Sequence, residues 1–151
     1  MTKTSTKTIG LCLLILGSIL SSGTFSPMVA LADEEKDTPV TIPNDTAGIW
    51  QAVDAETTEM SKLIQAGTVS DLHHHAYAVR DLVAALPTHS ASLAADKLAK
   101  VESGSKFVAI LAQRLDAAGD SNDKDAAASN FEKLNVILKS IRVNYSDANP
   151  K

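Results

Sequence analysis

Three of the four histidines stand in one run, His73-His74-His75, and they are the side chains of this sequence best suited to chemistry. A neutral imidazole is a common ligand of zinc, copper and nickel ions. The sequence therefore predicts a site for a copper, zinc or nickel ion at this run. From a neighbouring helix we expect Met60, with its thioether sulfur, and Glu59, with its carboxylate, as additional ligands.

The spacing of the histidines limits what one helix can do with them. Successive residues of an α-helix are turned by about 100°, so consecutive side chains fan out around the axis. We take the apolar stripe from Leu72 to Val79 as the inward side. His75 then flanks the stripe on one side and His73 on the other, while His74 points to solvent. Two histidines on one helix bind one ion well only when they are three or four positions apart.

A complete site therefore needs ligands from elsewhere, or local unfolding of the first turn so that the three rings gather. Glu56, Asp120 and Asp123 are further candidate ligands, and a homodimer with two opposed His75 rings would supply others. His89 lies about 20 Å further along the helix and is predicted at the opposite end. The competing interpretation is that the histidines are hydrogen-bonded surface groups that bind no ion. Both interpretations stay open.

Other chemistry finds little support in the sequence. No nucleophile, base and orienting acid can be assembled into a catalytic triad, and there is no glycine-rich phosphate loop, so we predict that the protein is not an enzyme. The acidic run 120–125 has the composition of a calcium loop, but Lys124 takes a ligand position and the glycine of the sharp turn is missing. We interpret this run as an acidic cap for the helix that follows.

The first residues predict export. Lys3 and Lys7 precede an apolar stretch at 9–20, and Ala30-Leu31-Ala32 is an A-x-A cleavage site, which together are typical of a signal peptide over residues 1–32. Serines and glycines interrupt the apolar stretch too early for a membrane span. We therefore expect a periplasmic protein, secreted through a Sec-type signal peptide that is cleaved after Ala32.

Cleavage would leave 119 of the 151 residues, enough for one domain with a hydrophobic core. Cys12, the only cysteine, would leave with the signal peptide, so the mature chain has neither a thiolate ligand nor a disulfide. Two lysines and no acids leave with it, so 12 basic and 18 acidic residues remain and the formal net charge changes from −4 to −6. This balance argues against nucleic acid and anionic membranes as partners, and it is compatible with cations.

The mature region carries helical periodicity and no strand pattern. Residues 33–45 are charged and contain two prolines, which predicts a flexible linker, and 147–151 form a tail. Four amphipathic helices fill 46–146. Their apolar seams are, in order, Ile49, Val53, Met60, Leu63 and Ile64; Leu72, Ala76, Val79, Val83 and Leu86; Ala94, Leu98, Val101, Ser105, Val108, Ala112 and Leu115; and Ala127, Phe131, Leu134, Leu138, Ile141 and Tyr145.

Four such helices with short connections predict an all-α fold, an antiparallel up-down-up-down four-helix bundle. Capping residues and breakers place the helix boundaries. In the third helix, Gly104 and Ser105 predict a bend or a close helix approach. The expected boundaries are Asn44 or Asp45 to Gly67, Thr68 or Ser70 to Pro87, Ser90 or Ser92 to Gly119, and Lys124 to Tyr145.

Part of this pattern is similar to the periplasmic cytochrome b four-helix bundle family. The residues concerned are Phe107, Leu111, Leu115, Gly119 and 142–145 (RVNY). That family holds haem between a methionine of the first helix and a histidine of the last. Met60 matches the first ligand, but the fourth helix here has no histidine, methionine or cysteine, and no Cys-x-x-Cys-His motif remains. We therefore expect the bundle without haem.

Four other segments resemble a second family: Ile49-Trp50, 73–82 (HHHAYAVRDL), Ala85-Leu86-Pro87 and 115–120 (LDAAGD). They look like those of small exported bacterial helical-bundle proteins associated with heavy-metal efflux systems. The resemblance implies a function in metal homeostasis or resistance and a metal-efflux or other envelope protein as partner. No ligand set carries over from it.

Two functions follow from the sequence. The first is an exported accessory protein that binds or senses a transition-metal ion through His73 and His75, helped by His74, Met60 or Glu59. The second is a metal-free helical adaptor or stress protein that binds an envelope partner through one face of the bundle.

Overall fold

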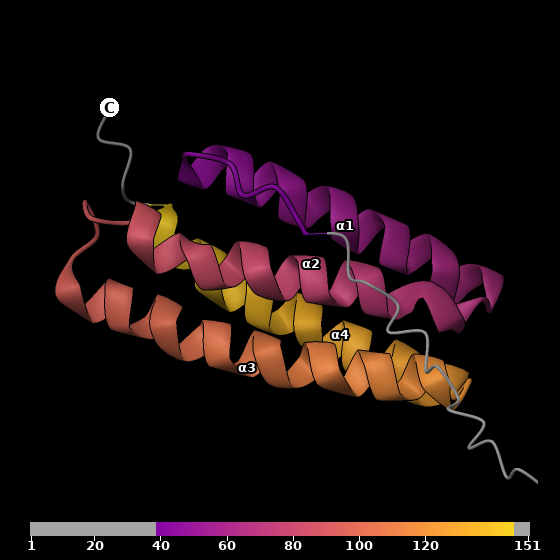
Figure 1. Ribbon diagram of the computed structural model, residues 1–151. Helices are drawn as coiled ribbons and strands as arrows, with labels where there is room; N and C mark the ends of the chain where they lie inside the picture. Colours follow the sequence, from indigo (N-terminus) through magenta and orange to yellow (C-terminus); the bar gives the residue numbers. More distant parts are fainter. Residues whose placement is uncertain (1–38, 147–151) are drawn as a thin grey trace, which may run out of the picture. The chain divides into compact units, whose positions relative to one another are not determined.

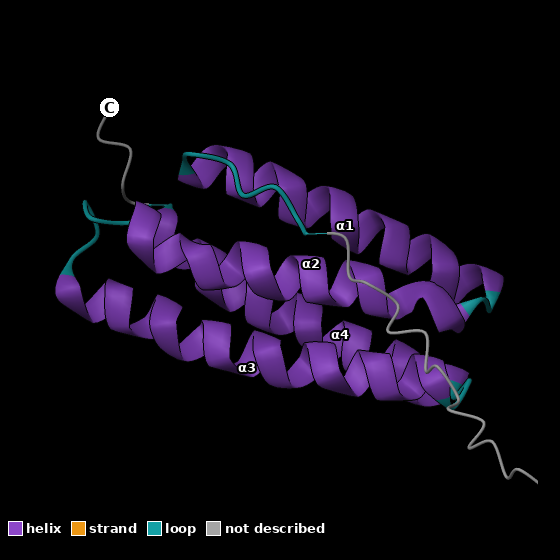
Figure 2. Cartoon of the chain, in the orientation of Figure 1, coloured by secondary structure: helices purple, strands orange, loops and turns teal. Residues whose placement is uncertain are grey.

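The computed structural model describes residues 39–146, which contain four α-helices, three short 3₁₀ segments and no strand (Figures 1 and 2). The all-α fold class is thus confirmed for this part of the chain. The predicted signal peptide (1–32) and tail (147–151) lie outside the described residues. The elements are α1 (Thr46–Ala66), η1 (Val69–Asp71), α2 (Leu72–Ala85), η2 (Leu86–His89), α3 (Ala95–Asp120), α4 (Lys124–Arg142) and η3 (Val143–Tyr145).

Helices that are consecutive in the chain pack against each other. α2 contacts both α1 and α3, and α3 contacts α4 along its length, whereas α1 touches α4 over few residues. None of the helices between residues 39 and 146 is long and apolar enough to cross a membrane.

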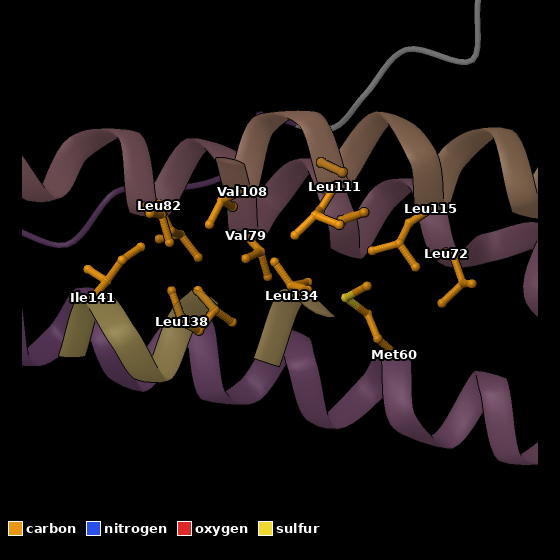
Figure 3. Close-up of a cluster of buried hydrophobic side chains, with 14 of the residues drawn as sticks. Met60, Leu72, Val79, Leu82, Val108, Leu111, Leu115, Leu134, Leu138 and Ile141 are labelled. Atoms are coloured by element: carbon orange, nitrogen blue, oxygen red, sulfur yellow. The ribbon is translucent and has the colours of Figure 1, made fainter. Parts of the chain in front are cut away.

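The four helices share one hydrophobic core (Figure 3). All five residues of the predicted α2 seam are fully buried, and Leu82 is buried beside them. In α3 the seam begins later than predicted, because Ala94 precedes the helix and is exposed. The largest fully buried side chains include Ile49, Met60, Leu72, Leu82, Leu86, Leu115, Leu134 and Ile141.

Both ends of α1 follow the predicted capping chemistry. The Asp45 carboxylate accepts a hydrogen bond of 2.7 Å from the backbone N–H of Gly48, at the exposed start of the helix. Gly67 ends the helix with φ of 72°, a left-handed conformation that costs a glycine little. The Gly67 N–H donates to the Ile64 carbonyl, which closes the last turn.

The predicted caps of α2 and α3 are wrong. Ser70 lies within η1, and α2 starts behind it without a side-chain cap. Ser90 is 1% exposed, and its hydroxyl donates to the Leu86 carbonyl and shares a 2.8 Å hydrogen bond with the Tyr145 hydroxyl. α3 begins at Ala95, again without a side-chain cap. Tyr145 is distant in sequence, so a pattern of local signals could not reveal that it engages Ser90.

Part of the segment predicted as a flexible linker lies against the helices. Residues 39–45 are non-helical, and α1 begins at Thr46 as predicted. Val40 and Ile42, however, are half-buried against the core, and Pro39 and Val40 lie beside His74. This segment therefore covers part of the surface near the histidine run.

Near the end of α4, one arginine joins this helix to α1. The Arg142 guanidinium donates to both carboxylate oxygens of Asp54, at 2.5 and 3.2 Å, and lies 4.4 Å from the centre of the Trp50 ring. Tyr145 meets the same ring edge-on, with 5.9 Å between ring centres. Burial raises the pKa of the Tyr145 phenol, and the hydrogen bond with Ser90 opposes that rise. These contacts link the first half of α1 to the end of α4 and to η3.

Two glycines allow close contacts between elements. A Cβ on Gly104 would lie 2.5 Å from Cγ1 of Ile141, which confirms the predicted close approach and identifies α4 as the neighbour. Gly119 lies in the last turn of α3, which runs one residue past the predicted end. A Cβ there would lie 2.7 Å from the backbone carbonyl oxygen of Val69 in η1.

The substitution Gly119→Ala tests this last contact. At an open helical position the change would stabilise the protein by about 1 kcal/mol, because alanine has the higher helix propensity. Here we expect the free energy of unfolding to fall by about 1–3 kcal/mol, since the methyl group meets backbone that cannot rotate away. Urea denaturation followed by circular dichroism measures the change. Ala99→Gly, at an exposed position of α3, is the control that measures the helix-propensity difference between alanine and glycine. A Gly119→Ala protein more stable than the wild type would disprove the contact.

Candidate functional site

The start of α2 positions the histidine run as the helical spacing predicts. Leu72, Ala76 and Val79 are fully buried, which fixes the rotation of the helix. His73 and His75 are consequently half-buried on either side of this stripe, and His74 is exposed. The three side chains therefore leave the helix axis in different directions, as predicted.

His75 reaches across to α1. Its Nδ1 lies 2.7 Å from a carboxylate oxygen of Glu56, and each of the two side chains is 28% exposed. When the ring is neutral and Nδ1 carries the proton, Nε2 carries the lone pair that a metal requires. A carboxylate on the other ring nitrogen is the usual way in which proteins orient a metal-binding histidine. Glu56 is thus placed to orient His75.

The other two histidines stay close to each other. The ring centres of His73 and His74 are 3.7 Å apart, with 45° between the ring planes. Nδ1 of His73 lies 3.0 Å from the carbonyl oxygen of Ser70. His74 and His75 line one small hollow together with Glu56, beneath Pro39 and Val40. These three residues therefore border the same space.

Glu59 lies on the exposed side of α1, one turn beyond Glu56. Its carboxylate accepts a hydrogen bond of 2.7 Å from the Lys62 ammonium. This hydrogen bond holds the pKa of Glu59 below its usual value; desolvation opposes the lowering, and the charges of Lys62 and His75 add to it. Glu59 is close enough to interact with the charge of His75, but its carboxylate is hydrogen-bonded to Lys62.

Met60 lies in the core. Its side chain is fully buried, and Figure 3 shows its sulfur among apolar side chains that include Leu134. A flexible thioether commonly fills such space. The structure thus brings Glu56 to His75, but it does not bring the sulfur of Met60 to the surface where His74 is exposed.

The remaining polar candidates lie elsewhere or have other partners. His89 is in η2, with Nδ1 at 3.1 Å from the carbonyl oxygen of Asn44, so it contacts the segment before α1. Asp123 caps α4, as the sequence predicts, by accepting a 2.9 Å hydrogen bond from the Ala126 N–H. Within residues 39–146 no group of three or more histidine, cysteine, aspartate or glutamate side chains is arranged to hold a metal ion.

A second surface was not predicted from the sequence. Phe107, Ile110 and Val136 are 54%, 44% and 66% exposed, which is unusual for large apolar side chains. They line a groove of about 500 Å³ between α3 and α4, two helices that lie side by side (Figure 1). Leu111 and Ile137 also line it. We call this the α3–α4 groove.

The α3–α4 groove extends along both helices. Phe107 and Ile137 also line a neighbouring hollow, with Lys100, Gly104 and Ser140 further along. At the other end the lining residues are charged: Arg114, Glu132 and Lys133. The sequence contains a signal for this surface, because Phe107 and Ile110 are three positions apart and off the α3 seam, and Val136 lies off the α4 seam.

Comparisons with protein-family models, with curated proteins and with solved structures found no match to this chain.

The contact between His75 and Glu56 can be measured by a double-mutant cycle. We expect His75→Ala and Glu56→Ala to be coupled by about 0.5–1 kcal/mol in the free energy of unfolding, because the pair is a charge-assisted hydrogen bond that is still partly exposed. A cycle of His74→Ala with Glu56→Ala is the control, and its coupling should be close to zero. Equal coupling energies in the two cycles would show that Glu56 interacts no more strongly with His75 than with His74.

Proposed function

We propose that this chain is a non-enzymatic helical adaptor that binds a helix of a partner protein in the α3–α4 groove. The observation that carries the proposal is the exposure of Phe107, Ile110 and Val136 together along one groove. Single exposed apolar side chains are common on protein surfaces, but a contiguous apolar patch is typical of a binding site. Burying such a patch contributes about 25 cal/mol for each Å² of apolar surface removed from water.

The shape of the groove favours a helix as the bound element. Two packed helices leave a furrow between them, and the side chains of a third helix can pack into it as ridges into grooves. In helix-in-groove recognition the bound helix carries apolar anchors one turn apart, and here they would pack against Phe107, Ile110 and Val136 of the groove.

We further propose that the protein is exported to the periplasm and meets its partner in the cell envelope. The support is the sequence of residues 1–32, with the charged start, the apolar stretch and the A-x-A site before Asp33. We also propose the up-down-up-down arrangement for the four helices, supported by their short connections and by the contacts between consecutive helices.

Photo-crosslinking in intact cells tests the adaptor function. A photo-crosslinking amino acid at position 110 should yield a discrete adduct with another protein, because this side chain lines the groove. The same amino acid at position 55, on the exposed face of α1, is the control and should not yield it. Adding Phe107→Asp should remove the adduct while the circular dichroism spectrum is retained. Equal labelling from both positions, or an adduct that survives Phe107→Asp, would overturn the proposal.

A second candidate function is the binding of a transition-metal ion by His75, oriented by Glu56, with His74 as a neighbouring ligand. The observation that favours it is the hollow lined by His74, His75 and Glu56, together with the hydrogen bond between Glu56 and His75. The resemblance of 73–82 to proteins that accompany heavy-metal efflux systems points the same way. A second copy of the chain, or water, would complete the coordination of a copper, zinc or nickel ion.

Isothermal titration of the protein, purified without a histidine tag, with zinc, copper and nickel salts tests this second function. We expect His75→Ala to abolish binding and Glu56→Gln to weaken it by about tenfold, because the carboxylate orients the ring. His89→Ala removes the same side chain at a distant position and should leave the affinity unchanged. Absence of binding by the wild type, or an unchanged affinity in His75→Ala, would exclude a metal site at the histidine run.

A further inference from the structure

The residues that line the α3–α4 groove carry more positive than negative charge. Lys100, Arg114 and Lys133 line it with positive charge, and Glu132 is the one acidic residue among its lining residues. Lys100 is partly balanced by Asp96, 3.9 Å away on the exposed side of α3. Arg114 and Lys133 therefore provide most of the positive potential, on a chain whose formal net charge is −4.

The length of the groove limits the size of what binds in it. Lys100 and Arg114, which line opposite ends, are fourteen positions apart on α3. At the rise of an α-helix this corresponds to about 21 Å, or about four helical turns. The apolar side chains of Phe107 and Ile110 lie between these basic ends. A short amphipathic helix has the length and the apolar face that such a groove accommodates.

From these observations we infer that the α3–α4 groove binds an amphipathic helix of about four turns whose apolar face is flanked by acidic residues. The inference rests on the proposed adaptor function and adds to it the charge of the partner. Acidic side chains beside the apolar face would meet Arg114 and Lys133 at one end of the groove and Lys100 at the other. Opposite charges at the rim increase the rate of association and select the partner.

Two other occupants fit the groove less well, one because of its charge and the other because of its shape. In a symmetric dimer joined through this face, the groove of one copy would lie against the groove of the other, and the positive charge that Glu132 and Asp96 leave unbalanced on each copy would be repulsive. An anionic membrane surface would be attracted by the lysines, but a groove between two helices is concave, whereas interfacial helices insert a continuous apolar face. The groove thus fits an acidic helix better than either.

Two synthetic peptides test the inference by fluorescence anisotropy with the full chain. Both carry the same leucine-rich apolar face over about four helical turns, one flanked by glutamate and the other by lysine. We expect the glutamate peptide to bind about tenfold more tightly at low ionic strength, with the difference shrinking as salt is added. Arg114→Glu combined with Lys133→Glu should reverse the preference. Lys62→Glu combined with Lys139→Glu makes the same change in net charge away from the groove and should preserve it.

The outcomes separate the charge of the partner from the existence of the site. Equal binding of the two peptides, lost in Phe107→Asp, would overturn the acidic partner and leave the adaptor function standing. Binding of neither peptide, or binding that Phe107→Asp does not weaken, would overturn both. If the full chain sediments as a dimer that Val136→Asp dissociates, the occupant of the groove is a second copy and not an acidic helix. If it co-sediments with phosphatidylglycerol vesicles through the same face, the occupant is a membrane.

Discussion

The burial of one side of α2 is the constraint from which the rest of the structure follows. This helix has a neighbour on each side, α1 and α3, and the residues of its seam are all fully buried. Large apolar side chains gain about 1.5–3 kcal/mol each from such burial, so the rotation of α2 about its axis is fixed. Because the rotation is fixed, His73 and His75 must lie at the two borders of the core. His75 meets Glu56 of α1 for that reason.

The features predicted correctly from the sequence are those encoded by periodicity or by a local backbone requirement. The α2 and α4 seams repeat at three and four residues, and Gly67 takes the left-handed conformation that ends α1. The fan of the three histidines is a direct consequence of the helical turn, and it too was predictable. Periodicity alone also predicts the all-α class, since residues 46–146 have no alternating pattern.

The features missed depend on contacts between residues that are far apart in sequence. Ser90 has the chemistry of a helix cap, but its hydroxyl is hydrogen-bonded to Tyr145, 55 residues later in the chain. Val40 and Ile42 lie in a charged, proline-containing segment, and only the folded helices provide the surface on which they pack. Phe107 lies off the α3 seam, but only the packing of α3 against α4 shows that it lines a groove with Val136.

The junction of α1 with α4 has a consequence for motion. α1 touches α4 over few residues, and much of that contact depends on Arg142 with Asp54 and Trp50, at the exposed surface. Elements with few contacts between them separate at a lower free-energy cost than extensively packed ones, so α1 and α4 part more readily than α3 and α4. When α1 lifts, Glu56 leaves His75, while the groove formed by α3 and α4 stays whole. The hollow at the histidines therefore depends on the packing of α1 against α2, whereas the apolar groove is formed by α3 and α4 alone.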